Sequence, residues 1–338
     1  MSLAERVGQL FMVGSAATGQ TGPSVALIRR YHVGSVILTG RSCLGVAATA
    51  HTTAVLQSAA RSTSSAGLPL LIATDQEGGM VQVLGGPGFS VLPSALQQGA
   101  TAVGSLRGQA QAWGFELHAA GVNVNLAPVM DVVPDAVAAS NAPIGAFDRQ
   151  LGQDLADVAE QGLAFMAGMD SAGVSSTIKH FPGLGRASGN PDNSSEVTDD
   201  VTSRHDAYLE PFATAIKAGA PMVMVSTATY RVLDPFHPAA FSATILTGIL
   251  RGGLGFTGVI ISDDLGRAAQ VSRWPPGQRA VDFISAGGDL VLTVEPTVIS
   301  QMTAAVLSKA GHDPAFRAQV DAAALRVLSA KRARGLCS

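Results

Sequence analysis

Residues 155–180 read LADVAEQGLAFMAGMDSAGVSSTIKH and contain one complete unit of the repeat that decides the fold. Apolar residues recur at three- and four-residue spacing over Leu155–Ala172, which predicts an amphipathic helix. Gly173 follows where a helix C-cap belongs. Val174–Lys179 is a short apolar run of the kind that forms a strand buried on both faces. The unit is therefore a helix that returns to a buried strand.

The same alternation recurs along the whole chain. Gly219 and Gly287 also stand just before strands, and Asp313–Arg334 reads as a closing helix. Eight strands that alternate with helices, without a break in composition, predict one α/β domain over residues 1–338, a single (β/α)8 barrel. An open doubly wound sheet is the alternative, and it is disfavoured because no Gly-x-Gly-x-x-Gly turn follows an early strand. The other seven apolar runs are Leu10–Gly14, Gly34–Thr39, Leu70–Thr74, Val122–Met130, Met222–Thr227, Val259–Ser262 and Asp289–Val294.

Composition excludes several classes of protein. Hydrophobic residues make up 47% of the 338 residues and charged residues 14%, which supplies a large core. The net charge of -3 gives no electrostatic reason to expect nucleic acid or an anionic membrane as a partner. No uninterrupted apolar run is long enough to span a bilayer. Cys43 and Cys337 alone build no disulfide framework.

The start of the sequence bears on location. Met1–Arg6 lacks the basic-then-apolar order of a signal peptide. The sequence as it stands is therefore consistent with a cytoplasmic protein, whereas a trimmed native signal would place it in the cell envelope or outside the cell. Oligomeric state is left open.

Polar residues cluster where five of the predicted strands end. The carboxyl ends of barrel strands meet at one face, where active sites of this fold are built, so we expect these groups to share one rim. The loops Gly85–Pro93 and Pro182–Val201 follow strands and should lie at the same face. The strand ends are Thr74–Gly79, Ala127–Asp131, Lys179–Gly183, Ser226–Tyr230 and Ser262–Leu265.

Lys179 is one of only four lysines, and it stands at the end of a buried strand. A buried lysine needs a partner. One interpretation is an internal ion pair with Asp75 or Asp131. The other is that Lys179 and His180 hold the hydroxyl groups of a polar ligand.

Two aspartates, Asp263 and Asp264, follow the seventh strand. Successive strand residues point to opposite sides, so one carboxylate should enter the site while the other supports the turn. No His-x-His or HExxH spacing occurs, and we expect neither metal nor cofactor. A small, uncharged, polyhydroxylated ligand fits these groups, with a carboxylate on strand seven as the candidate nucleophile.

Several of these motifs together resemble glycoside hydrolase family 3, and in particular its single-domain bacterial β-N-acetylglucosaminidases. The resemblance extends from about residue 5 to residue 295. It implies a retaining exo-acting hydrolase that cleaves terminal N-acetylglucosamine from cell-wall fragments or chitin oligomers, with a small carbohydrate as its partner. The motifs are Arg6–Gly14, Asp75–Gly79, Ala127–Asp131, Lys179–Gly183 and Gly255–Leu265.

The resemblance also implies roles for individual residues. Asp263 matches the family's nucleophile, which forms a covalent glycosyl-enzyme that water then hydrolyses with retention of configuration. Asp75 matches the aspartate that binds sugar hydroxyls, and Lys179 and His180 match the pair that binds neighbouring hydroxyls. Arg149 matches the substrate-binding arginine of the family.

The loop after the fifth strand departs from the family pattern. Members of this group carry an Asp-Ser-His whose histidine is the general acid/base; here Asp192 matches the aspartate, but Ser194 stands in the histidine's place. Serine is far too weak an acid to protonate a leaving oxygen at neutral pH. Three interpretations follow: Asp192 is the acid, His205 or Glu196 is the acid, or the barrel binds amino-sugars and cleaves them slowly or not at all.

Overall fold

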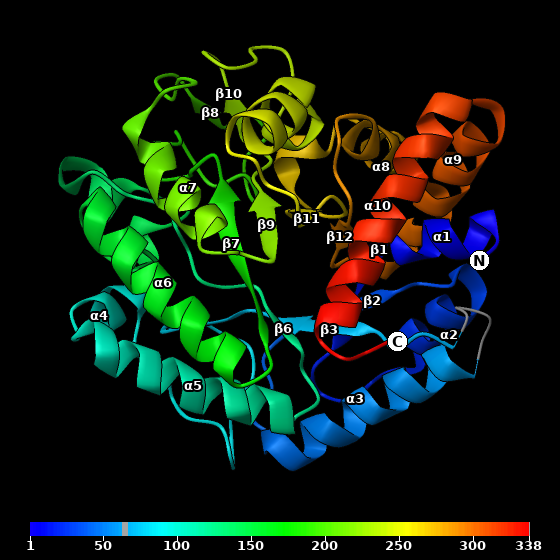
Figure 1. Ribbon diagram of the computed structural model, residues 1–338, viewed down its shortest axis with the longest axis horizontal. Coiled ribbons are helices and arrows are strands. Elements are labelled where there is room, and N and C mark those ends of the chain that lie inside the picture. Colours follow the sequence, from blue (N-terminus) through cyan, green and yellow to red (C-terminus); the bar gives the residue numbers. More distant parts are fainter. Residues whose placement is uncertain (63–66, 338) are drawn as a thin grey trace.

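The computed structural model describes residues 1–62 and 67–337, and its eight main strands form one parallel sheet in the order β11-β9-β7-β6-β3-β2-β1-β12. A parallel bridge between Ile261 and Leu290 joins the two ends of that order, which closes the sheet into a cylinder (Figure 1). The predicted (β/α)8 barrel is confirmed. The strands are β1 (Phe11–Ala16), β2 (Ser35–Thr39), β3 (Leu71–Thr74), β6 (Val124–Asn125), β7 (Ser175–Phe181), β9 (Met222–Val225), β11 (Val259–Ser262) and β12 (Val291–Thr293).

Each predicted strand is present, and the fourth differs most in length. The sequence predicts a strand over Val122–Met130, whereas β6 covers only Val124–Asn125. Pro128 lies within the remainder of the run and has no N–H group to donate to a ladder. Beyond it, an isolated bridge between Val129 and Lys179 continues the pairing with β7. An apolar run predicts where a strand lies more securely than where it ends.

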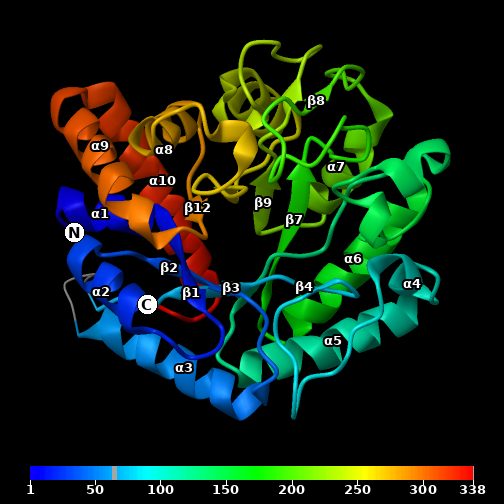
Figure 2. The ribbon, with the colours of Figure 1, turned by 180° about the vertical axis from the view of Figure 1, so that it is seen from behind.

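Helices surround the cylinder (Figure 2). The amphipathic helix predicted over Leu155–Ala172 is α6 (Leu155–Ser171), and Gly173, Gly219 and Gly287 follow helices with φ of +81°, +91° and +107°. The left-handed C-caps expected at these glycines are therefore confirmed. The helices that follow the eight strands are α2 (Gly22–Tyr31), α3 (Gly45–Arg61), α5 (Val103–Ala119), α6 (Leu155–Ser171), α7 (Glu210–Lys217), the π-helix η5 (Thr244–Gly253), α8 (Pro276–Ser285) and α9 (Ile299–His312).

Further elements lie outside the eight strands and the helices that follow them. The loop Pro182–Val201 contains β8 (Thr198–Asp199), which pairs with β10 (Thr229–Tyr230) in a separate two-stranded sheet. A hairpin of β4 (Gln76–Gly78) and β5 (Val81–Gln82) follows β3. The remaining elements are α1 (Leu3–Gln9), α4 (Ala95–Gly99), α10 (Pro314–Ala333) and the 3-10 helices η1 (Asp135–Ser140), η2 (Gly145–Phe147), η3 (Ala207–Leu209), η4 (Ala239–Phe241), η6 (Ala269–Val271) and η7 (Pro296–Val298).

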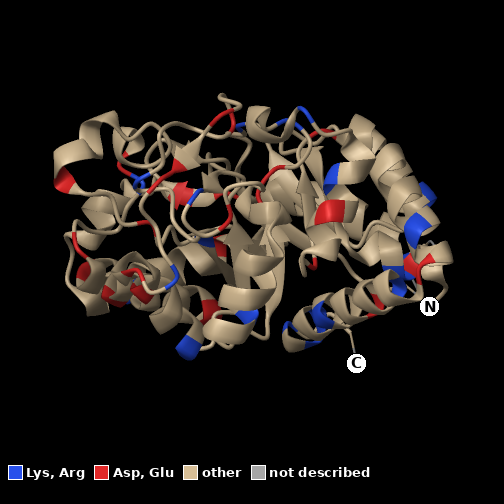
Figure 3. Cartoon of the chain, turned by 90° about the horizontal axis from the view of Figure 1, so that it is seen from above, with Lys and Arg blue, Asp and Glu red and all other residues tan. Residues whose placement is uncertain are grey.

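The strands are buried on both faces, which explains their near-continuous apolar sequences. One face contributes to an inner cluster that includes Met12, Leu71 and Met224, and the other packs against the helices. No described helix is both long and apolar enough to cross a membrane. Basic and acidic positions are interspersed over the helices and loops (Figure 3).

Helix α10, the predicted closing helix, covers the amino-terminal end of the barrel. Its Val327 is fully buried in the inner cluster. Lys331, also fully buried, donates a hydrogen bond from Nζ to Oε1 of Gln9, 2.6 Å away. Burial disfavours the ammonium ion and lowers the pKa of Lys331 to about 7.

We expect Lys331→Met to change how stability depends on pH. The pKa of Lys331 is lower in the folded chain than in the unfolded chain. Between about pH 7 and pH 10 the unfolded chain therefore binds a proton that the folded chain has released, and the free energy of unfolding of the wild type rises with pH. The variant lacks that gain, so its stability relative to wild type should fall over this range by up to about 1.4 kcal/mol per pH unit.

Denaturant unfolding at pH 7, 8.5 and 10 measures this difference. Lys217→Met is the matched control, because the Lys217 side chain is exposed on α7. A difference between Lys331→Met and wild type that stays constant with pH would contradict the proposed state of the buried ammonium group.

Candidate active site

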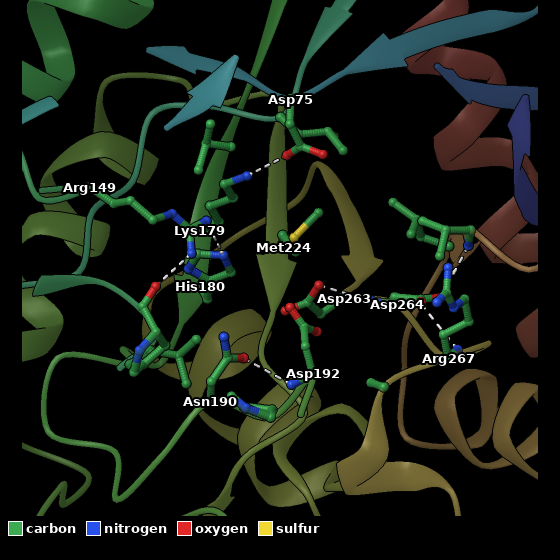
Figure 4. A pocket seen from close by; sticks show the side chains of 18 of the residues that line it. Asp75, Arg149, Lys179, His180, Asn190, Asp192, Met224, Asp263, Asp264 and Arg267 are labelled. Carbon is green, nitrogen blue, oxygen red and sulfur yellow. Dashed lines mark hydrogen bonds and ion pairs between the residues drawn. The ribbon is translucent and has the colours of Figure 1, made fainter. Parts of the chain in front are cut away.

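A cavity of about 420 Å³ opens at the carboxyl ends of the strands. Its floor is apolar and is formed by inward-facing strand residues such as Ile37, Met224 and Leu292. Polar groups from β7, from the loops that follow β3, β6 and β7, and from the segment after β11 surround the opening (Figure 4). All six residues singled out from the sequence line this one cavity, namely Asp75, Arg149, Lys179, His180, Asp192 and Asp263.

Lys179 pairs with two carboxylates from the segment after β3. Its Nζ lies 2.6 Å from Oδ1 of Asp75 and 2.6 Å from Oε1 of Glu77. Burial alone would lower the pKa of Lys179, but the charges of Asp75 and Glu77 outweigh burial and raise it. The predicted ion pair with Asp75 is confirmed, and Lys179 also lines the cavity, so the two interpretations of this residue are compatible.

Glu77 is a residue whose importance the sequence analysis missed. Its buried carboxylate accepts two hydrogen bonds from Arg149, with Nε to Oε2 at 2.9 Å and Nη2 to Oε1 at 2.8 Å. Burial would raise the pKa of Glu77, but Arg149 and then Lys179 hold it well below its usual range. The signal was available, because residues two apart along an extended segment share a face and Glu77 stands two after Asp75.

His180 is oriented by Asp131, which the sequence analysis considered only as a partner of Lys179. The His180 Nδ1 lies 2.7 Å from Oδ2 of Asp131, which is fully buried. The Asp131 carboxylate also accepts hydrogen bonds from the backbone N–H groups of His180 and Leu184. With Nδ1 donating to Asp131, the His180 Nε2 is an acceptor, 3.3 Å from Nη2 of Arg149.

The two adjacent aspartates after β11 both line the cavity, but their carboxylates have different partners. Asp264 accepts backbone hydrogen bonds from Gly266, Arg267 and Val294, so its carboxylate holds the turn. The Asp263 carboxylate extends into the cavity (Figure 4). Asp263 directly follows β11, whose four residues are all buried, so the strand holds Asp263 in place.

Asp192 lies at the mouth of the cavity and its side chain points toward Asp263 (Figure 4). Partial desolvation by the surrounding protein, followed by the negative charge of Asp263, raises the pKa of Asp192 to about 6. The side chain is still exposed to solvent in the open cavity. Asp192 is therefore a carboxyl group that can hold a proton near neutral pH.

The other two acids considered from the sequence do not share this position. His205 and Glu196 are both exposed, and neither is among the residues that line the cavity. Ser194 is also exposed and outside the lining. Within residues 1–62 and 67–337, no three His, Cys, Asp or Glu side chains are grouped so that they could hold a metal ion.

Comparison with known proteins places the chain in a family. The family model of the "Glycosyl hydrolase family 3 N terminal domain" matches residues 2–330. The chain is 32% identical over 307 residues to a beta-hexosaminidase of Xanthomonas euvesicatoria pv. vesicatoria (strain 85-10), covering 88% of this chain and 87% of the relative.

Solved structures are similar throughout the barrel. A beta-N-acetylhexosaminidase from Beutenbergia cavernae DSM 12333 is 51% identical with a TM-score of 0.97, covering 98% of this chain and 99% of that one. A glycoside hydrolase family 3 beta-N-acetylglucosaminidase from Paenibacillus sp. str. FPU-7 is 30% identical with a TM-score of 0.88, covering 99% of this chain and 63% of that one. The chain belongs to glycoside hydrolase family 3.

Proposed function

We propose that this protein is a retaining exo-β-N-acetylglucosaminidase, a β-hexosaminidase that uses residues 1–338 as one catalytic barrel. The observation that carries the proposal is a pair of facing carboxylates, Asp263 and Asp192, at one end of a cavity whose other wall is built from hydrogen-bonding groups. The hexosaminidase names of the similar proteins support this class of substrate. No feature of the described residues favours a non-catalytic, sugar-binding barrel. Cell-wall fragments and chitin oligomers are the substrates that we propose.

Asp263 acts as the nucleophile in this mechanism. Its carboxylate attacks the anomeric carbon, the bond from C1 to the leaving oxygen breaks, and a glycosyl ester forms. Water then attacks C1, the ester bond breaks and the carboxylate is regenerated, so that two inversions give net retention. The fixed position of Asp263 at the end of β11 supports this role, because a nucleophile must be held close to the reacting atom.

Asp192 acts first as the general acid and then as the general base. Its proton passes to the leaving oxygen as the bond from C1 breaks, and the resulting carboxylate later accepts a proton from water. The charge of Asp263 is one cause of the raised pKa of Asp192. Formation of the ester removes that charge, so the pKa of Asp192 falls at the step in which a base is needed.

Asp75, Lys179, Arg149 and His180 bind the sugar in the proposal. The ion pairs among these residues and Glu77 fix the direction of each donor before the ligand arrives. Preorganised donors on hydroxyls remote from the bond that breaks supply binding energy that positions C1 against Asp263.

We expect Asp263→Asn to lose turnover of an aryl β-N-acetylglucosaminide by more than about 10,000-fold, because an amide does not form the glycosyl ester. Steady-state kinetics and circular dichroism measure activity and fold together, and the exposed Asp157→Asn on α6 is the matched control. A 2-fluoro sugar substrate should leave a covalent adduct on Asp263; peptide mapping that places it on another residue would overturn the assignment.

We expect Asp192→Ala to lose about 100- to 10,000-fold in kcat/KM on unactivated alkyl glycosides and much less on aryl glycosides, whose leaving groups need no proton. Because the acid must be protonated in the free enzyme, wild-type kcat/KM should fall as pH rises through about 6, and the variant should lack this limb. Equal losses on both substrates would remove Asp192 as the proton donor.

We expect Glu77→Gln to raise KM about tenfold or more, because a neutral amide removes the carboxylate that pairs with Arg149 and one of the two carboxylates that pair with buried Lys179. Initial-rate kinetics with an aryl substrate separate KM from kcat. Glu116→Gln is the control, since Glu116 bonds Ser90 away from the cavity lining. A wild-type KM for Glu77→Gln would show that the network does not position the binding groups.

A further inference from the structure

The loop that carries Asp192 is held from within by Asn190, whose Oδ1 accepts a hydrogen bond from the N–H of Asp192 at 2.9 Å and whose carbonyl accepts from Asn193 and Ser194. Residues 192–196 are all exposed, while Val197, which follows them, is buried. A general acid must stay within hydrogen-bond reach of the leaving oxygen, and a misplacement of about 1 Å can cost about 100-fold in rate. The contacts that hold this loop therefore bear directly on the reaction.

The loop is docked on η6 (Ala269–Val271), in the segment that follows Asp263. The backbone N–H of Ala269 donates to the carbonyl of Asp192 at 3.1 Å, and the N–H of Gln270 donates to the carbonyl of Pro191 at 3.1 Å. The stretch of chain that begins with the proposed nucleophile thus also holds the backbone of the proposed acid.

The side chain of Gln270 adds two bonds on the other side of the exposed stretch. Its Oε1 accepts from the N–H of Val197 at 2.8 Å, and its Nε2 donates to the carbonyl of Val197 at 3.2 Å. The Nε2 also lies 3.3 Å from Oγ1 of Thr229, on β10. The Gln270 side chain is buried, so water does not replace these bonds readily.

We propose that Gln270 is a positioning residue for catalysis: its carboxamide fixes the loop so that Asp192 is held at a set distance from Asp263. The inference rests on the proposed function, and it goes beyond that function by naming the contact that aligns acid and nucleophile. The carboxamide suits this task because one side chain pairs with both backbone groups of a single residue, which fixes the direction as well as the distance of the loop.

The test compares substrates that do and do not need a proton. Gln270→Met keeps the volume of the side chain and removes both bonds to Val197. We expect kcat/KM to fall about 10- to 100-fold on an alkyl β-N-acetylglucosaminide and less than about threefold on a 2,4-dinitrophenyl one. An equal loss on the two substrates would overturn the proposal.

Gln57→Met is the matched control. The Gln57 side chain makes the same pair of hydrogen bonds with Leu70, accepting from its N–H at 2.8 Å and donating to its carbonyl at 3.0 Å. This pair lies at the opposite end of the barrel. We expect this variant to lose stability without changing the ratio of the two substrates. If Gln57→Met changes that ratio as much as Gln270→Met does, the effect is one of general stability and the proposal fails.

The pH dependence of kcat/KM in Gln270→Glu distinguishes a positioning role of the side chain from simple misfolding. Ionised, its carboxylate still accepts from the N–H of Val197 but has no hydrogen to donate to the carbonyl; protonated, it regains the donor. We expect its kcat/KM on the alkyl glycoside to recover toward the wild-type value as pH falls from 7 to 5. A constant ratio to wild type over this range would contradict the role assigned to the carboxamide.

The double variant separates this proposal from the proposed function. With Asp192→Ala already present, Gln270→Met should cause no further selective loss on the alkyl glycoside, because the group it positions is gone. Additive losses would overturn the proposal. If Asp192→Ala itself fails to separate the two substrates, the assignment of the acid is wrong as well; if it separates them and Gln270→Met does not, only the present inference falls.

Discussion

Charge pairing at the mouth of the barrel is the constraint on which the site depends. Two cations, buried Lys179 and half-buried Arg149, stand beside two carboxylates, Asp75 and Glu77, and every one of the four groups has a partner of opposite sign. An unpaired charge in such a place costs several kcal/mol. The network therefore exists only when β3 and β7 and the loop that carries Arg149 are all in place, which couples the shape of the binding wall to the completion of the fold.

The closed sheet is what brings these charges together. Asp75 and Lys179 are 104 residues apart in the chain, yet their side chains touch because β3 and β7 both end at the same face and β6 lies between them. The same geometry gives Asp263, the proposed nucleophile, its rigidity and leaves Asp192, the proposed acid, on a loop. One carboxylate is thus fixed by a strand, whereas the other depends on contacts that a loop makes with its neighbours.

Much of this arrangement could be predicted from the sequence, for identifiable reasons. Apolar runs located all eight strands because both faces of each are buried, and polar residues at strand ends located the cavity because parallel strands share a direction. Asp131 and Gln270 were missed as functional residues because their importance lies in partners far along the chain, whereas Glu77 could have been found from its position two residues after Asp75. Hydrogen bonds between distant residues leave no trace in local periodicity. Pro128, which lies beyond β6, was visible, but its effect on a ladder depends on the neighbouring strand.

The bond between Lys331 and Gln9 joins residues 322 positions apart, and it seals the barrel at the end remote from the cavity. Because α1 is synthesised long before α10, this contact forms only after α10 has been made. Until then the inner apolar cluster lacks its Val327 cover and is open to chaperones and to association with other nascent chains. Closure of the barrel at this end therefore depends on two helices, α1 and α10, that lie far apart in the chain.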